Sequence, residues 1–279
     1  MGKTMETHSD ISEPLTSAAL MRSVRAFEVP NDGLGVWFLG QNGFLIKTAS
    51  GLVCAIDPYL TDSCPSKFAD SPFDLGRELP IFLEPEDLDV DVYAITHSHE
   101  DHLDEATVRR LRCHALFLAP WDAYQKLLTY GVDASSCRLL HANETVELNG
   151  VSVRGTFAIP TDDTDLNHIG LLFEAANGVR FYNTGDTAFS EGLARLLPRD
   201  VDLCAICING RFGNLSSSEA ARVVVEIQPR IAVPTHYDMM RCNLSDPEGF
   251  RTEVATLGTA TIVKVMEYGV PLVVLRSER

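Results

Sequence analysis

Four side chains that could bind metal ions lie within a short stretch of the chain. The spacing is His-x-His-x-Asp-His, with His97, His99, Asp101 and His102 at the fixed positions. Imidazole nitrogen and carboxylate oxygen are ligands for zinc, manganese and iron, and no Cys in the motif favours a thiolate site. A turn can direct the first two histidines toward one ion and the last two residues toward a second. A solvated polar turn is the alternative, but crowding three imidazoles beside a carboxylate is costly unless a metal uses their lone pairs.

Further candidate ligands follow apolar segments at distant positions in the chain. Residues 92–95 are apolar and predict a buried strand that ends just before His97. Asp57, Asp186 and His236 each follow another predicted strand. We therefore predict two stacked sheets with helices outside, and a dinuclear metal site at one edge of the sheets. Asp57 has two interpretations, a turn cap before a proline or a buried group that supports the ligands.

Hydrophobic patterning predicts alternating groups of strands and helices. Two Asn-Gly pairs, at 42–43 and 149–150, predict β-hairpin turns. Asp104 is placed to cap a helix that reaches about residue 112. The predicted strands cover 35–40, 44–48, 52–56, 92–95, 116–119, 137–140, 144–148, 151–157, 168–173, 179–182, 201–208 and 231–233, and the predicted helices cover 18–24, 105–112, 121–130, 191–197 and 217–227.

Composition and charge restrict the possible functions. The chain has 279 residues, of which 45% are hydrophobic, which is enough for one large core. We predict an N-terminal extension over residues 1–30 and one hydrolase domain over 31–279. The net charge of −16 argues against binding to nucleic acid or to an anionic membrane, because phosphate contacts need clustered Lys and Arg. A small anionic substrate held locally remains compatible with this charge.

Cysteine usage and the N-terminal sequence predict a cytoplasmic protein. The 7 cysteines are an odd number scattered through apolar segments, which is typical of a reducing compartment. Cys204 and Cys207 lie in one apolar run and would face opposite sides of a strand, so we interpret them as core residues. The chain shows no signal-peptide pattern and no apolar run of membrane-spanning length.

Two loops are candidates for substrate contact. Residues 59–80 contain several prolines and aromatic residues without clear periodicity, so they predict a long loop that could flank or close over a site. Asn209 and Arg211 follow a predicted strand at the expected edge. The Arg211 guanidinium could bind a carboxylate or phosphate, although pairing with a surface acid explains it equally well.

The metal motif, together with Asp57, Asp186 and His236, resembles the metallo-β-lactamase superfamily. The resemblance covers about residues 35–245. Four further segments most resemble the L-ascorbate-6-phosphate lactonase family: Trp-Phe-Leu-Gly at 37–40 with Gly43, Leu-Glu-Pro-Glu-Asp at 83–87, Asn-Thr-Gly-Asp-Thr at 183–187 and Pro-Thr-His-Tyr-Asp at 234–238.

This resemblance implies an α+β protein with a four-layer αββα sandwich and the metals at one edge. It also implies a role for each ligand and a homo-oligomeric assembly. By matching motif, His97 and His99 would bind the first ion, Asp101 and His102 the second, Asp186 would bridge, His236 would complete the second site and Asp57 would steady the loop.

The third-motif histidine of the superfamily has no clean counterpart in this sequence. His168 is the only histidine between residues 157 and 170, and it is the first residue of a predicted strand. Asp162, Asp163 and Asp165 compete with it, and we place His168 first. A carboxylate at this position would make the site harder and favour manganese over zinc.

The ligands imply hydrolysis by a hydroxide that two divalent ions share, with manganese or zinc first and iron as the alternative. Two cations lower the pKa of a shared water toward neutrality, so no Ser or Cys nucleophile is needed. Asp101 could later pass a proton to the leaving alcohol. We expect a small-molecule substrate, a lactone or ester, and derivatives of phosphorylated sugar acids are candidates. The alternatives are a phosphodiesterase of the same superfamily and a metal-binding protein without catalysis.

Overall fold

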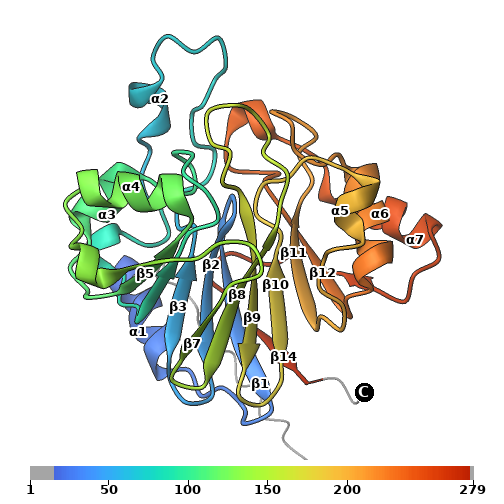
Figure 1. Ribbon diagram of the computed structural model, residues 1–279, viewed down its shortest axis with the longest axis horizontal. Coiled ribbons are helices and arrows are strands. Elements are labelled where there is room, and N and C mark those ends of the chain that lie inside the picture. The colour runs from blue at the N-terminus through green and yellow to red at the C-terminus, as the bar shows by residue number, and fades with distance from the viewer. Residues whose placement is uncertain (1–15, 277–279) are drawn as a thin grey trace, which may run out of the picture.

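The computed structural model of the chain, described for residues 16–276, consists of two facing sheets between two layers of helices (Figure 1). Each sheet has seven strands among the described residues, in the orders β14-β1-β2-β3-β4-β5-β6 and β13-β12-β11-β10-β9-β8-β7. Helices α1, α3 and α4 cover the first sheet, and α5, α6 and α7 cover the second. This arrangement confirms the predicted αββα sandwich.

The element bounds agree closely with the hydrophobic patterning. The strands are β1 (Gly33–Gly40), β2 (Gly43–Thr48), β3 (Val53–Ile56), β4 (Val92–Ala94), β5 (Leu116–Ala119), β6 (Cys137–Leu139), β7 (Thr145–Leu148), β8 (Val151–Phe157), β9 (Ile169–Ala175), β10 (Arg180–Asn183), β11 (Leu203–Cys207), β12 (Ile231–Thr235), β13 (Ile262–Val263) and β14 (Leu272–Leu275). The helices are α1 (Ser17–Ala26), α2 (Cys64–Lys67), α3 (Glu105–Arg110), α4 (Trp121–Thr129), α5 (Glu191–Ala194), α6 (Ser217–Ile227) and α7 (Pro247–Thr256).

Strand β1 shows how one strand serves two cores. Val36 and Phe38 face the second sheet, and Trp37 and Leu39 face the helices, because successive side chains of a strand point to opposite faces. All eight residues of β1 are buried, as expected for a strand covered on both sides. Cys204 and Cys207 are buried and free, which confirms that they are core residues.

The structure differs from the expectation in several elements, because α2, α7, β13 and β14 were not predicted and α5 is shorter than predicted. Helix α5 ends at Ala194 instead of residue 197, and Pro198 disfavours helical backbone at Leu197, the last residue of the predicted helix. Helix α1 buries Leu20 and Met21 in the core of its own chain, so the segment from residue 17 is part of the layered fold. Residues 1–15 of the predicted extension lie outside the described residues, and the division at residue 30 stays a prediction.

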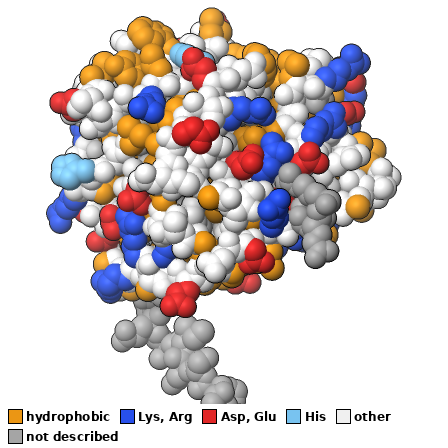
Figure 2. All heavy atoms as spheres, turned by 60° about the horizontal axis from the view of Figure 1, so that its bottom comes forward, with side chains coloured by type: hydrophobic (Ala, Val, Ile, Leu, Met, Phe, Trp, Pro, Cys, Tyr) orange, Lys and Arg blue, Asp and Glu red, His pale blue; other side chains and the backbone are white. Residues whose placement is uncertain are grey.

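Charges of both signs are distributed over one face of the molecule (Figure 2). On the face that Figure 2 shows, Lys and Arg side chains are interspersed with Asp and Glu instead of forming one basic patch. None of the helices described between residues 16 and 276 has the length and apolar content needed to cross a membrane.

Asp104 caps α3 and also binds Thr61 in the 59–80 segment, so we expect the loss of its carboxylate to destabilise the fold. Its fully buried carboxylate accepts from the backbone N–H groups of Ala106 and Thr107, each at 3.0 Å, and from the Thr61 hydroxyl at 2.6 Å. Asp104→Ala should lower the free energy of unfolding by about 2 kcal/mol. Urea denaturation followed by circular dichroism measures the change.

The matched control for Asp104 is Asp133→Ala, because the exposed side chain of Asp133 caps only a three-residue turn and accepts from its neighbour Ser135. This variant should leave the urea midpoint unchanged. Equal midpoints for the two variants would contradict the role given to Asp104.

Candidate metal centre

The predicted ligands meet at one edge of the sandwich because their strands end there. The loop after β4 carries His97, His99, Asp101 and His102. In the other sheet, β10 and β12 run parallel to β11, and Asp186 and His236 follow their carboxyl ends. His168 directly precedes β9, which is antiparallel to β10 and therefore begins at the same edge. The strand-end argument from the sequence thus places all these side chains together.

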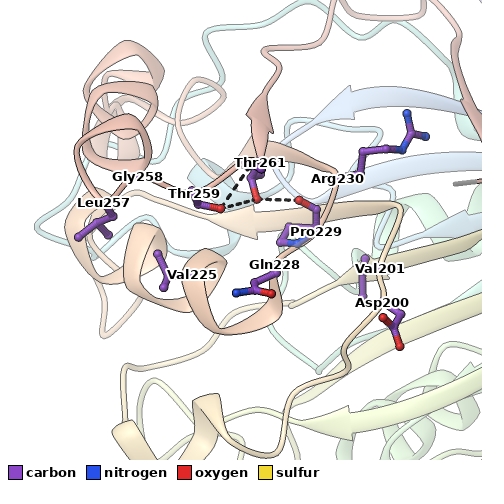
Figure 3. Close-up of a pocket in the computed structure, with 11 residues that line it drawn as sticks. Asp200, Val201, Val225, Gln228, Pro229, Arg230, Leu257, Gly258, Thr259 and Thr261 are labelled. Atoms are coloured by element: carbon purple, nitrogen blue, oxygen red, sulfur yellow. Dashed lines mark hydrogen bonds between the residues drawn. The ribbon is translucent and has the colours of Figure 1, made fainter. Parts of the chain in front are cut away.

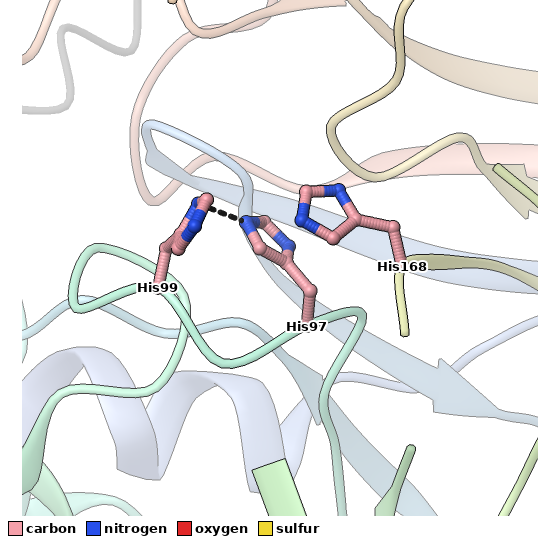
Figure 4. A group of neighbouring side chains, drawn as sticks. All are labelled: His97, His99 and His168. Atoms are coloured by element: carbon pink, nitrogen blue, oxygen red, sulfur yellow. Dashed lines mark hydrogen bonds between the residues drawn. The ribbon is translucent and has the colours of Figure 1, made fainter. Parts of the chain in front are cut away.

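The first group of possible ligands consists of His97, His99 and His168 (Figure 4). The His97 Nε2 and His99 Nδ1 atoms lie 3.0 Å apart, and the ring centroids of His97 and His168 are separated by 4.0 Å. The Nδ1–H of His168 donates to the backbone oxygen of Asp186 at 3.1 Å. Its Nε2 atom is buried without a hydrogen-bond partner, so the lone pair of that atom is available to a metal ion.

The three competing aspartates are placed differently. Asp165 is buried, and its carboxylate accepts from the backbone N–H groups of Ser98 and Asn167, each at 2.7 Å. Asp162 is exposed and accepts from Thr164, and Asp163 is also exposed. Of these four candidates, His168 alone belongs to a group of possible ligands among the described residues.

The second group consists of Asp101, His102 and His236, and Asp186 lies beside it. The His236 Nε2 atom is 2.9 Å from both His102 Nε2 and Asp186 Oδ1, and His102 Nε2 is 3.4 Å from Asp186 Oδ1. Asp186 also groups with His97 and His102, so its carboxylate lies between the two sets of histidines. This position is the one a bridging ligand requires.

The electrostatics of these groups fit divalent ions. Burial, with His102 and His168 nearby, holds the pKa of His97 well below its usual range, so its imidazole is neutral and can bind a metal. Burial opposes a charge on His102, but the carboxylates around it hold its pKa well above the usual range. Burial also opposes ionisation of Asp186, yet His236 and His102 hold its pKa well below the usual range. His97 and Asp186 thus offer a neutral and an anionic donor, which zinc, manganese and iron bind, whereas His102 must lose a proton before its Nε2 atom can bind a metal.

A family model described as the beta-lactamase superfamily domain matches residues 35–236. The chain belongs to the metallo-β-lactamase superfamily. Relatives within this superfamily are named metal-dependent hydrolases, and the groups of possible ligands in this chain agree with that class. The finer resemblance to L-ascorbate-6-phosphate lactonases stays a prediction.

Similar proteins agree with the family. A metal-dependent hydrolase of Thermoplasma acidophilum is 26% identical over 215 residues, which are 76% of this chain and 88% of the relative. One from Methanosarcina mazei is 27% identical over 243 residues, 82% of this chain and 95% of the relative. The solved structure of the metallo hydrolase Igni18 from Ignicoccus hospitalis has a TM-score of 0.70 and 21% identity, and covers 86% of this chain and 98% of that one. The similarity to Igni18 shows a shared fold only.

Asp57 is the buried group that supports the superfamily motif in this chain, and not a solvent-facing turn cap. It is fully buried, and its Oδ2 accepts from the Nδ1–H of His102 at 2.7 Å and from the Asn42 amide at 2.8 Å. Its Oδ1 accepts from the Thr96 backbone N–H at 2.8 Å. Because Nδ1 of His102 is held by Asp57, Nε2 of that ring faces the ligands.

The hairpin turn between β1 and β2 adds two side chains that the sequence analysis did not assign to the site. Gln41 and Asn42 are almost completely buried. The Gln41 Nε2 donates to Asp101 at 2.7 Å and lies 3.0 Å from His236 Nδ1. The only sequence signal was a turn motif, and polar residues in a turn ordinarily indicate exposure to solvent.

A cavity of about 520 Å³ opens onto this edge. His99, Asp101, Asp186 and His236 lie on its wall. The remaining lining residues come mainly from the 59–80 segment, from α4 and from the loops after β8, β11 and β12: Cys64, Lys67, Phe68, Leu75, Glu100, Lys126, Tyr130, Thr161, Asp162, Thr164, Phe212, Asn214, Met240 and Asn243.

The loop after β11 contributes different residues from those predicted to bind substrate. Asn209 and Arg211 are not part of the cavity wall, because the Asn209 amide donates to Asn243 at 3.0 Å and Arg211 is exposed outside it. Phe212 and Asn214 of the same loop line the cavity instead.

A second cavity, of about 530 Å³, lies near the start of β12, at the opposite end of that strand from His236 (Figure 3). Its wall includes Gln228, Arg230 and Leu257, and the Thr261 hydroxyl donates to the Pro229 carbonyl at 2.7 Å. None of the possible metal-binding groups among the described residues lies there.

Proposed function

We propose that this chain hydrolyses a small lactone or ester with two divalent ions, manganese or zinc, with iron as the alternative. The observation that carries the proposal is that two groups of possible ligands meet at Asp186 on the wall of a cavity of about 520 Å³. The net charge of −16 supports a small-molecule substrate over nucleic acid. The homo-oligomeric state and the cytoplasmic location remain predictions.

Each ligand has a role in the proposal. The first ion would be held by His97, His99 and His168, and the second by Asp101, His102 and His236, with Asp186 contacting both. Two bound divalent ions supply a water that ionises near neutral pH and a positive charge that polarises the substrate oxygen. The protein orients these ligands through Asp57 and Gln41, and the cavity positions the carbonyl of the substrate beside them.

Asp101 is placed to move the proton. Its side chain is 19% exposed, faces the cavity and is held by the Gln41 amide. Burial opposes its ionisation, but His102 and His236 hold its pKa below the usual value, so it enters the reaction as a carboxylate. In this position its carboxylate could carry a proton to the leaving alkoxide.

A substrate panel tests the proposal directly. The metal-loaded chain should hydrolyse lactones or carboxylic esters with a kcat/KM at least about ten-fold above that for a chromogenic phosphodiester, because the proposed site positions a carbonyl. The panel includes a lactone of a phosphorylated sugar acid. Turnover of the phosphodiester alone would identify a phosphodiesterase, and no turnover with both ions bound would identify a metal-binding protein without catalysis.

Asp101→Asn should lower kcat by roughly a hundred-fold while metal content is retained, because the amide oxygen can still bind a cation but cannot carry a proton. The measurement compares two esters of one acid, with para-nitrophenol and with benzyl alcohol as leaving groups. The loss of kcat should be larger for the benzyl ester, because the benzyl alkoxide is a more basic leaving group and requires protonation. Asp163→Asn, which alters an exposed carboxylate that belongs to none of the possible ligand groups, is the control. An equal loss of kcat for the two esters would contradict the proton-transfer role of Asp101.

A further inference from the structure

Three phenylalanines lie exposed beside the cavity, although proteins usually bury phenylalanine side chains in the core. Phe68 is 45% exposed, Phe73 is 51% exposed and Phe212 is 43% exposed. Phe68 and Phe212 line the cavity, and the ring of Phe73 contacts that of Phe212 edge to face, with centroids 4.9 Å apart. They come from two segments that are distant in sequence. A cluster of exposed aromatic side chains next to a reactive site indicates a binding surface.

The backbone holds Phe212 in place. Its φ of 51° lies in the left-handed region, which is unusual for a bulky residue and persists only where the surrounding structure imposes it. The loop is closed by the bond from the Asn214 N–H to the Arg211 carbonyl at 2.9 Å. A Cβ atom at the neighbouring Gly213 would lie 2.3 Å from the Thr161 carbonyl oxygen, so this loop packs tightly against the backbone of the loop after β8. The ring is therefore positioned before any ligand arrives.

The segment that carries Phe68 is anchored as well. The segment with α2 extends beyond the edge of the sheets (Figure 1). Its base is fixed because Tyr59 and Cys64 pack against Met239 and Met240. The Arg77 guanidinium also donates to the Tyr59 carbonyl at 2.9 Å. Phe68 thus follows a short helix whose start is tied to the segment after β12.

The cations of the cavity wall are already engaged. The Lys67 ammonium lies 2.5 Å from Glu100 and 3.5 Å from Glu105, so two carboxylates balance its charge. Lys126 donates to the backbone carbonyl of Ser98 at 2.5 Å. Away from the metal ligands, the wall offers mainly apolar surface, from Phe68, Leu75, Phe212 and Met240. A phosphorylated sugar would leave this surface without a matching partner.

We infer that the substrate carries an aromatic ring, which lies between Phe68 and Phe212 while its reacting carbonyl faces Asp101 and Asp186. The identity of the reacting group rests on the proposed function, whereas the binding of the ring does not. Two fixed phenylalanines select a flat apolar group because it can stack on or meet both rings and remove their exposed surface from water.

Binding without turnover tests this inference. Isothermal titration calorimetry of the zinc-loaded chain compares phenylacetohydroxamic acid with acetohydroxamic acid, two metal-binding probes that differ by one phenyl ring. The phenyl compound should bind about ten-fold or more tightly. Phe68→Ala and Phe212→Ala should each reduce the ratio of the two Kd values several-fold. Phe157→Ala, which removes an exposed phenylalanine outside the cavity wall, should leave the ratio unchanged.

The outcomes separate this inference from the proposed function. A Kd ratio near one, or a ratio that neither variant changes, would overturn the aromatic subsite. A ratio of about ten that falls in both variants supports it, even if no ester is hydrolysed, in which case the proposed function alone would fail. Hydrolysis of lactones without any preference for a phenyl group would leave the proposed function in place and remove the inference.

Discussion

Replacing Asp186 with alanine will reduce the metal content from about two ions per chain to one or none and lower kcat/KM by roughly a thousand-fold. The Asp186 Oδ1 atom lies 2.9 Å from His236 Nε2 and 3.4 Å from His102 Nε2, and it also groups with His97. No other carboxylate among the described residues belongs to a group with His97, so its loss should affect both ions.

Elemental mass spectrometry measures this metal content on protein purified without chelator or affinity metal, and the most active ester of the panel gives kcat/KM. Asp163→Ala is the matched control, because Asp163 is an exposed acid near the same edge. Because Asp186 also accepts from the Asn214 amide at 2.7 Å, Asp186→Asn serves as a second variant of nearly the same shape. Two ions per chain in both Asp186 variants would rule out a bridging role.

Replacing Asp57 with alanine will lower the free energy of unfolding by about 3 to 5 kcal/mol and weaken metal binding by about ten-fold to a hundred-fold. The alanine leaves the Asn42 amide, the Thr96 N–H and the His102 Nδ1–H without their acceptor in a fully buried place. An unpaired buried donor costs free energy because it has lost water without gaining another partner. Freed from Asp57, the His102 ring also loses its fixed orientation.

Urea denaturation of the metal-free chain measures the first effect, and competition with a chromogenic chelator measures the second. Asp57→Asn is the conservative variant, and it should fall between the wild type and the alanine variant because an amide keeps one acceptor oxygen. Asp70→Ala, which changes an exposed acid of the following loop, should alter neither quantity. Unchanged metal affinity in the Asp57 variants would reduce Asp57 to a purely structural role.

The sequence was sufficient where the chemistry and the local pattern lie close together along the chain. The motif from His97 to His102 follows a short apolar strand, so both the ligands and their place at a strand end could be predicted. Helix α6 spans Ser217–Ile227 as predicted, because Ser216 and Glu219 form a capping box that fixes its start locally. The layered αββα fold followed from the recurrence of strands that end in Asp or His and from the family resemblance.

The tertiary structure decided which of several neighbouring polar residues face the site. His168 is placed with His97, while Asp165 is used by the backbone N–H groups of Ser98 and Asn167. The Asn167 donor is local, but Ser98 comes from a loop far away in sequence, so the pattern around residues 162–168 could not reveal that contact.

The same reason applies to the turn at Gln41 and to the loop at Phe212. Gln41 is buried because the loop after β4 and the end of β12 pack over the turn, and Phe212 faces the cavity because its loop rests against Thr161. Residue type and spacing determined the chemistry available to this protein. The direction in which each side chain points depends on contacts between segments that are distant in sequence, and only the folded chain brings those segments together.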